Sequence, residues 1–133
     1  MENLYKEGTK FFTQDVDEHV IEYVKNEPTI ESGVRQGDKV IITKIPYMTI
    51  DYLNEQDEQL KRYHYCHCPW VREALKTGDI EISPMFCYCS AGYYKQQWDA
   101  ILDQPVKVEV LETILNGDNK CKFAVHLPKK FIP

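Results

Sequence analysis

Four of the five cysteines lie in one stretch of the chain, residues 64–92. They form two Cys-x-Cys pairs: Cys66 with Cys68, and Cys87 with Cys89. Each pair leads into a segment whose sequence predicts the start of a helix. The partial positive charge at a helix N-terminus stabilises a thiolate, the form of cysteine that binds a metal or attacks an electrophilic carbon. His64 and His67 flank the first pair, so we expect the chemistry of the chain in this stretch.

Three interpretations of the cysteine pairs follow from the chemistry of thiols. In the first, the two pairs bind a zinc ion, since thiolates are favoured zinc ligands in proteins. In the second, Cys68 or Cys89 is a catalytic nucleophile. Its base would then be His64 or His67. In the third, the thiols are small buried hydrophobic groups without a chemical function. The convergence of both pairs on helix starts favours the metal site.

Length and charge limit the class of protein to which the chain belongs. Its 133 residues, 43% hydrophobic and 28% charged, are typical of a single soluble domain. A formal net charge of −5 argues against a nucleic-acid partner and against binding to an anionic membrane. No apolar run is long enough to span a bilayer, and the N-terminus lacks the hydrophobic stretch of a signal peptide. We therefore expect a cytoplasmic protein with reduced thiols.

The first half of the chain predicts one helix and three strands. Residues 1–14 show no period and are expected to form a loose lead-in. A helix is predicted over residues 15–26, with Asp15 as its N-cap. The β-branched run within residues 39–45 predicts a strand. Two further strands, over residues 48–53 and 60–66, are predicted to pair through a polar turn.

The second half predicts two helices, a short strand between them and a terminal hairpin. Pro69 opens a helix that Gly78 ends, and a short edge strand is predicted at residues 80–83. The next helix spans residues 90–102, with Ser90 as its cap. Its inward face, and that of the preceding helix, would carry the larger apolar side chains, including Trp70, Trp98 and Ile101.

The hairpin is expected to be tight, because Asn116-Gly117 is the strongest two-residue turn signal. It joins strands over residues 106–115 and 121–127. The resulting register places valines of the first strand opposite apolar residues of the second: Val106 with Leu127, Val108 with Val125, and Val110 with Phe123.

That register also puts Glu112 opposite Cys121 on the buried side of the hairpin. A buried carboxylate is costly without a partner, so Glu112 is a candidate ligand or ion-pair residue. The order of all elements indicates the α+β class: an antiparallel sheet with helices packed on one face and a C-terminal β-hairpin.

Four motifs of the second half carry a family resemblance: Cys68-Pro69, Cys87-x4-Gly92-Tyr93, Pro105-Val106-x-Val108-Glu109-Val110 and Gly117-Asp118-x-x-Cys121-x-Phe123. With these motifs, residues 60–128 resemble the 4-vinyl reductase-type domains. The chain is most similar to an uncharacterised bacterial family with the Cys-x-Cys-Ser-x-Gly motif found at residues 87–92.

The resemblance implies a dimeric domain that binds a small molecule as a sensor. It also implies a structural zinc ion held by Cys87, Glu112 and Cys121, although the further hairpin cysteine of the family is missing here. A related branch hydrolyses a cyclic amino-thiazoline carboxylic acid. That branch implies a different function, a thiol-dependent hydrolase that uses a cysteine nucleophile and a histidine base.

From these observations we predict a single domain, residues 1–133, that binds a small molecule and forms a homodimer. The predicted zinc ligands are Cys66, Cys68, Cys87 and Cys89, followed by Glu112 and Cys121. The predicted ligand-binding side chains are the aromatic residues around them: Tyr65, Tyr88, Tyr93 and Trp98. The thiol-dependent hydrolase is the alternative function. Only this alternative would make the chain an enzyme, so the sequence leaves enzymatic activity open.

Overall fold

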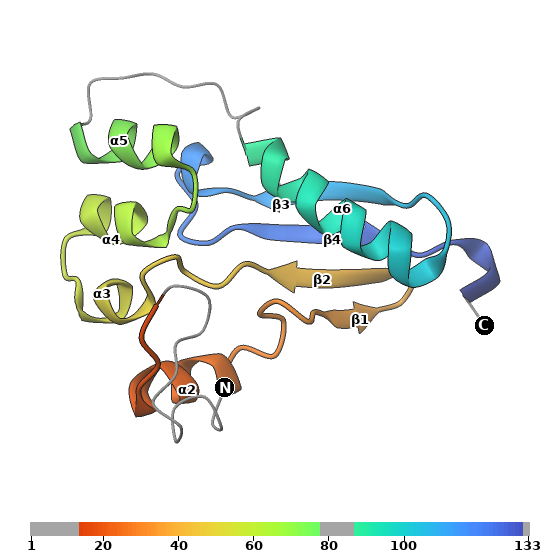
Figure 1. Cartoon of the computed structure of the whole chain (residues 1–133), viewed down its shortest axis with the longest axis horizontal. Coiled ribbons are helices and arrows are strands. Elements are labelled where there is room, and N and C mark those ends of the chain that lie inside the picture. The colour runs from red at the N-terminus through yellow and green to blue at the C-terminus, as the bar shows by residue number, and fades with distance from the viewer. Residues whose placement is uncertain (1–13, 78–86, 132–133) are drawn as a thin grey trace. The chain divides into compact units, whose positions relative to one another are not determined.

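The computed structural model describes residues 14–77 and 87–131 (Figure 1). Contacts group the chain into two compact units, and each unit is built from two separate segments. The helical unit comprises Met1–Pro28 and Ile45–Glu81, and the sheet unit comprises Thr29–Lys44 and Ile82–Pro133. Each unit is described by itself below.

In the part of the helical unit that the structure describes there are four helices: α2 (Glu18–Lys25), α3 (Thr49–Asn54), α4 (Glu58–Tyr65) and α5 (Pro69–Thr77). The predicted first helix is confirmed as α2, but its N-cap is Asp17 and not Asp15. The Asp17 carboxylate accepts a hydrogen bond from the Val20 N–H at 2.9 Å, which satisfies one of the unpaired donors of the first turn. Val20 and Ile21 form the buried face of α2, and with Val16, which precedes the helix, they pack with Ile50 of α3.

The strands predicted at residues 48–53 and 60–66 are wrong, because both segments are helical. Short apolar runs do not distinguish a strand from a helix, and the tyrosines of α4 fit either. The decisive local signal is Asp57, whose carboxylate accepts from the N–H groups of Gln59 and Leu60 and so caps α4. Cys66 follows as the C-cap residue in an extended conformation.

The helix predicted after Cys68 is confirmed as α5, and the Cys68 carbonyl accepts from the Arg72 N–H at 2.9 Å. Val71 and Ala74 form its buried face. Trp70 was expected to be inward, but it lies in the first turn of α5 and is 70% exposed. The glycine stop at residue 78 and the strand at residues 80–83 lie outside the described residues.

The sheet unit is built on a four-stranded antiparallel sheet with the strand order β1-β2-β4-β3. The strands are β1 (Val34–Gln36), β2 (Lys39–Thr43), β3 (Lys107–Glu112) and β4 (Lys122–His126). The predicted strand at residues 39–45 is confirmed as β2. The predicted register is also found in β3 and β4, where Val108 lies opposite Val125 and Val110 opposite Phe123. The fold therefore has both helices and an antiparallel sheet, as expected.

The two-residue turn predicted between β3 and β4 does not form. A 3-10 helix, η2 (Ile114–Asn116), occupies that position, and Gly117 ends it with φ 90°. The wider loop is stabilised by Thr113, whose hydroxyl accepts from the Asn116 N–H, and by Asp118, whose carboxylate accepts from the Thr113 N–H. These two hydrogen bonds between side chains and the backbone stabilise the wider loop in place of a tight hairpin turn.

Glu112 is not on the buried side, and it is not opposite Cys121. The register shifts between Val110 and Glu112, so that Glu112 pairs with Lys122. An irregularity of this kind re-aims the side chains that follow it. The Glu112 carboxylate, 43% exposed, lies 3.7 Å from the Lys122 ammonium, and this lysine is the partner that the carboxylate was expected to need.

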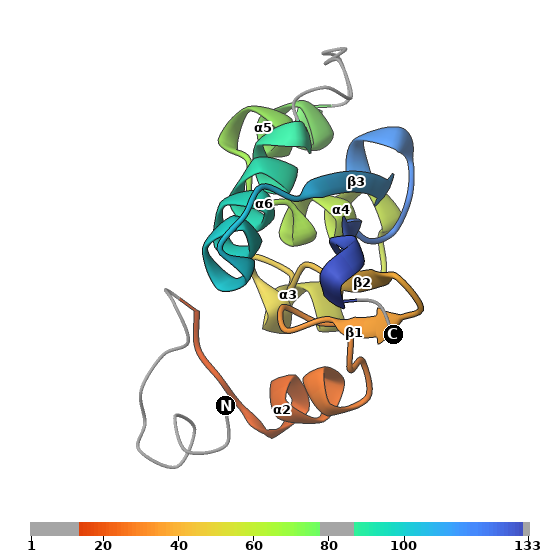
Figure 2. The same ribbon diagram turned by 90° about the vertical axis from the view of Figure 1, so that its right-hand side faces the viewer.

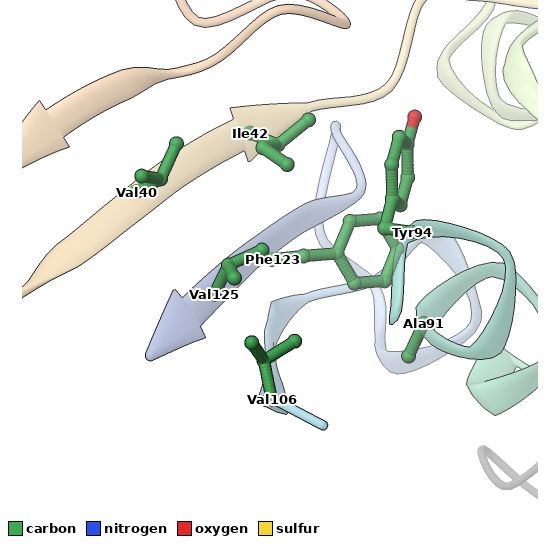
Figure 3. Packing of buried hydrophobic residues seen from close by; sticks show 7 residues of the cluster. All are labelled: Val40, Ile42, Ala91, Tyr94, Val106, Phe123 and Val125. Carbon is green, nitrogen blue, oxygen red and sulfur yellow. The ribbon is translucent and has the colours of Figure 1, made fainter. Parts of the chain in front are cut away.

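Helix α6 (Tyr88–Leu102) packs against β3 and β4 on one face of the sheet (Figures 1 and 2). It begins two residues before the predicted start, and Cys87 takes the N-cap position that was assigned to Ser90. The buried core beneath it contains Val40, Ile42, Ala91, Tyr94, Val106, Phe123 and Val125 (Figure 3). Trp98 packs against this core as expected, but Ile101 is 64% exposed. None of the helices described here is both long and apolar enough to cross a membrane.

Candidate functional site

A cavity of about 450 Å³ lies in the helical unit beside the start of α3. Its volume is in the range of roughly 300–1,000 Å³ that is usual for small-molecule sites. The lining combines an aromatic ring, apolar side chains, an amide and two carboxylates: Gln14, Asp15, Tyr47, Met48, Thr49, Ile50 and Asp51. We call this the α3 cavity. Its mixture of apolar surface and a few polar groups is the usual composition of a ligand pocket.

One side of the α3 cavity is fixed by Gln14, which uses both ends of its side-chain amide. The Gln14 Nε2 donates to the Pro46 carbonyl at 3.1 Å, and Oε1 accepts from the Thr49 N–H at 3.0 Å. The Thr49 hydroxyl, which is buried, also donates to the Pro46 carbonyl at 3.0 Å. These bonds hold a segment that is distant in sequence against the start of α3.

A second part of the wall, formed by Tyr47 and Met48, is held by the end of α4. The Tyr47 N–H donates to the Tyr65 carbonyl at 3.0 Å, and the Met48 N–H donates to the His64 carbonyl at 2.9 Å. The end of α4, which carries His64, is therefore bound directly to this wall of the cavity.

Arg72 of α5 contacts this wall both by stacking on aromatic rings and by donating hydrogen bonds. Its guanidinium carbon lies 4.8 Å from the centroid of the Tyr47 ring and 4.4 Å from that of the Tyr63 ring. Its Nη2 donates to the Met48 sulfur at 2.9 Å, and its Nε donates to the Tyr63 carbonyl at 3.2 Å. A planar cation that stacks and donates in this way fixes the rings it touches.

His67 supports the same wall from another direction. Its Nε2 lies 2.7 Å from the Ile45 carbonyl. A carbonyl only accepts, so Nε2 carries the proton of this bond. The imidazole is also edge-on to the Tyr47 ring, with the centroids 5.2 Å apart. A residue predicted as a catalytic base is thus engaged in positioning Tyr47.

His64 is oriented by a carboxylate. Its Nε2 lies 3.3 Å from Glu55 Oε1, and because the carboxylate accepts, Nε2 is the protonated nitrogen. Its Nδ1 is buried and has no hydrogen-bond partner among the described residues. A carboxylate that holds an imidazole in one tautomer is found both in metal sites and in acid–base catalysis. Of the two predicted histidines, His64 therefore retains a nitrogen for further chemistry.

The thiols are distributed over both units. In the helical unit Cys66 is buried, with its sulfur 4.0 Å from the Cys68 carbonyl, and Cys68 is half-buried at the start of α5. In the sheet unit Cys89 is exposed in the first turn of α6, whereas Cys87 and Cys121 are half-buried. The expectation that Cys89 would immediately precede the helix is wrong, since Cys87 has that position.

The zinc set implied by the family resemblance, Cys87, Glu112 and Cys121, stays a prediction. Glu112 forms an ion pair with Lys122, and its side chain is partly exposed on the strand. Among residues 14–77 and 87–131, no three or more His, Cys, Asp or Glu side chains form a group that could hold a metal ion. The site with all four paired cysteines stays a prediction.

The predicted ligand-binding aromatic residues do not line the α3 cavity. Tyr65 is fully buried and packs edge-on against Tyr52, with the centroids 5.4 Å apart. In the sheet unit Tyr88 and Tyr93 are exposed, and Trp98 packs on the core. The residues that do line the cavity were missed because residues 48–53 were assigned to a strand. Correct recognition of the Asp57 cap would have favoured helices here.

A second group of polar side chains, also missed, lies beside α6 in the sheet unit. The Tyr94 hydroxyl donates to Glu31 Oε2 at 2.7 Å, and Figure 3 shows this hydroxyl pointing away from the apolar cluster. Burial of the phenol, reinforced by the Glu31 carboxylate, raises the pKa of Tyr94 far above the usual tyrosine value, so it remains a donor.

Comparison with known proteins identifies the family of the chain and nothing more specific. The model of a family of unknown function, DUF6144, matches residues 48–132, which is more than half of the sequence and includes α3 to β4. Neither a curated protein nor a solved structure matches. By this match over most of its folded elements, the chain belongs to DUF6144, a family of unknown function.

Proposed function

We propose that the chain is a small-molecule-binding domain and that its ligand occupies the α3 cavity. The observation that carries this proposal is the cavity of about 450 Å³ with its mixed aromatic, apolar and polar lining. Tyr47 supplies a ring for stacking, Ile50 and Met48 supply apolar surface, and Asp51 supplies an exposed carboxylate at the rim.

The bracing of the cavity supports the same proposal. Gln14, His67 and Arg72 hold the two walls by hydrogen bonds and ring contacts before any ligand arrives. A pocket that is ordered in advance requires less loss of conformational entropy on binding, which raises affinity.

The wider role is also part of the proposal. The resemblance of residues 60–128 to 4-vinyl reductase-type domains supports a sensor-like function and a homodimer. The five cysteines, all within the described residues, form no disulfide, which supports a reducing compartment such as the cytoplasm. A zinc ion bound by the paired cysteines is part of this proposal. The alternative is a thiol-dependent hydrolase in which Cys68 or Cys89 is the nucleophile and His64 or His67 is the base.

The test is ligand binding with a variant that blocks the cavity. A panel of small aromatic compounds is screened by protein NMR, and the affinity of each hit is measured for Asp51→Trp. Asp51 is exposed at the rim, so an indole there fills the entrance without burying a charge. The matched control is Glu73→Trp on the exposed side of α5.

We expect hits to lose at least about tenfold in affinity with Asp51→Trp and to bind Glu73→Trp as they bind the wild type. Chemical-shift changes should centre on residues 47–51. Hits that bind the Asp51→Trp variant with unchanged affinity, or a complete absence of hits from the panel, would count against the α3 cavity as a ligand site.

A further inference from the structure

The charged side chains that line the α3 cavity are all of one sign among the described residues. Asp15 and Asp51 contribute carboxylates, whereas no lysine, arginine or histidine of the described chain belongs to the lining. Both aspartates are exposed, and exposed carboxylates are ionised at neutral pH. A concave site lined by one sign of charge concentrates ligands of the opposite sign. This distribution of charge favours a cationic ligand.

Asp51 is the carboxylate that a ligand can reach most directly. It lies in the first turn of α3, and no lysine, arginine or histidine in the described part of the chain forms an ion pair with it. The partial positive charge at the start of a helix favours an anion, and Asp51 already supplies one there. An anionic ligand would be repelled by this carboxylate, whereas an ammonium group would pair with it.

The polar side chains on the Gln14 side of the cavity have already donated protons to the protein. The Thr49 hydroxyl donates its only proton to the Pro46 carbonyl, so its oxygen retains only the capacity to accept. The Gln14 Nε2 donates to the same carbonyl. With the two carboxylates, the side chains of the lining therefore offer mainly hydrogen-bond acceptors. An ammonium group, which has three N–H donors and no acceptor, matches such a lining.

The rest of the lining fits an apolar group attached to the ammonium. Tyr47 supplies an aromatic ring, and Met48 and Ile50 supply apolar side chains. Arg72 stacks on the Tyr47 ring at 4.8 Å but is not one of the lining residues, so its positive charge lies behind the wall. A cavity with an apolar floor and a carboxylate at its rim accommodates a ligand with one apolar end and one cationic end.

We propose that the ligand of the α3 cavity is a small primary amine with an apolar body, bound as its ammonium ion. This inference rests on the proposed function, because it names the class of ligand for the same cavity. Asp51 pairs with the ammonium group, and Asp15 adds to the negative potential around it. The ring of Tyr47 and the side chains of Met48 and Ile50 contact the apolar body.

The test compares three ligands of similar size and different charge: phenethylamine, a cation; phenethyl alcohol, which is neutral; and hydrocinnamate, an anion. The affinity of each is measured by NMR titration at neutral pH. Asp51→Asn removes the negative charge with almost no change in shape, and Asp51→Trp blocks the cavity. The matched control, Glu73→Gln, removes a carboxylate from an exposed position of α5 that does not line the cavity.

We expect phenethylamine to bind at least about threefold more tightly than the alcohol, and hydrocinnamate to bind most weakly. Asp51→Asn should lower the affinity for the amine by about two- to fivefold and leave that for the alcohol unchanged. Glu73→Gln should bind all three compounds as the wild type does.

Two results would overturn the amine proposal and leave the cavity as a ligand site. One is equal binding of the amine and the alcohol, with both lost in Asp51→Trp. The other is an unchanged affinity of Asp51→Asn for the amine, again with binding lost in Asp51→Trp. A different result, in which none of the three compounds shifts the signals of residues 47–51, would overturn both this inference and the proposed function.

Discussion

Replacing Arg72 with lysine tests whether the wall of the α3 cavity depends on a planar cation. The substitution retains the charge but removes the two ring contacts of the guanidinium, each worth about 0.5–1 kcal/mol at partly exposed sites. It also removes the hydrogen bond from Nε to the Tyr63 carbonyl, worth about 1.5–3 kcal/mol for a charged donor. Because lysine recovers part of this energy, we expect a net loss of ~2–4 kcal/mol in the free energy of unfolding.

The assay is urea unfolding followed by NMR, since the two tryptophans report on different units. Trp70 belongs to the helical unit and Trp98 to the sheet unit. The Trp70 indole signal should change at a lower urea concentration in Arg72→Lys than in wild type. The matched control is Arg35→Lys, whose Nε donates to the Gly37 carbonyl at an exposed position, and we expect it to cost less than about 0.5 kcal/mol. Equal losses in the two variants would refute the reasoning.

Three further predictions address other features. Tyr94→Phe should lower the free energy of unfolding by about 1–3 kcal/mol, measured by urea denaturation, because the Glu31 carboxylate loses its buried donor; an unchanged stability would contradict this. The hydrogen bonds to Asp99 from a lysine one turn earlier and from a backbone N–H lower the pKa of its carboxyl. The contribution of this carboxylate to stability is therefore present above the ordinary aspartate pKa and is lost as the pH falls through the lowered pKa. Asp99→Asn should flatten the acid side of a curve of unfolding free energy against pH in that window. Exposed Cys89 should react with iodoacetamide faster than buried Cys66 by mass-spectrometric counting, whereas protection of Cys89 that ends on adding a chelator would support the four-cysteine zinc site.

The elements that could be predicted from the sequence are those with a strong local signal. The β-branched run predicts β2, and the alternation of apolar and polar residues predicts β3 and β4. Pro69 likewise marks a helix start. The pairing of Val110 with Phe123 followed from the same alternation, and it survived an incorrect turn. After Val110 the predicted register fails, because the observed loop shifts it and pairs Glu112 with Lys122 instead of Cys121.

The candidate site could not be predicted, because its interactions join residues distant in sequence. Gln14 reaches Thr49 across 35 residues, and Arg72 reaches Met48 across 24. No periodicity or motif encodes such pairs, since each forms only after tertiary structure has brought its members together. His64 and His67 were recognised as chemically important types, but their actual partners, Glu55 and the Ile45 carbonyl, depend on the helical course of residues 58–65.

The strand order β1-β2-β4-β3 has a consequence for how the chain folds. Val40 of β2 pairs with Val125 of β4, so closing the sheet requires contact between residues 85 positions apart, from 40 to 125. The entropic cost of such a loop must be met before the pairing yields any energy, which slows folding. On the ribosome, the segments of the helical unit are complete before β4 is synthesised. During that interval one edge of β2 has no neighbour, and an unpaired strand edge is a template for aggregation.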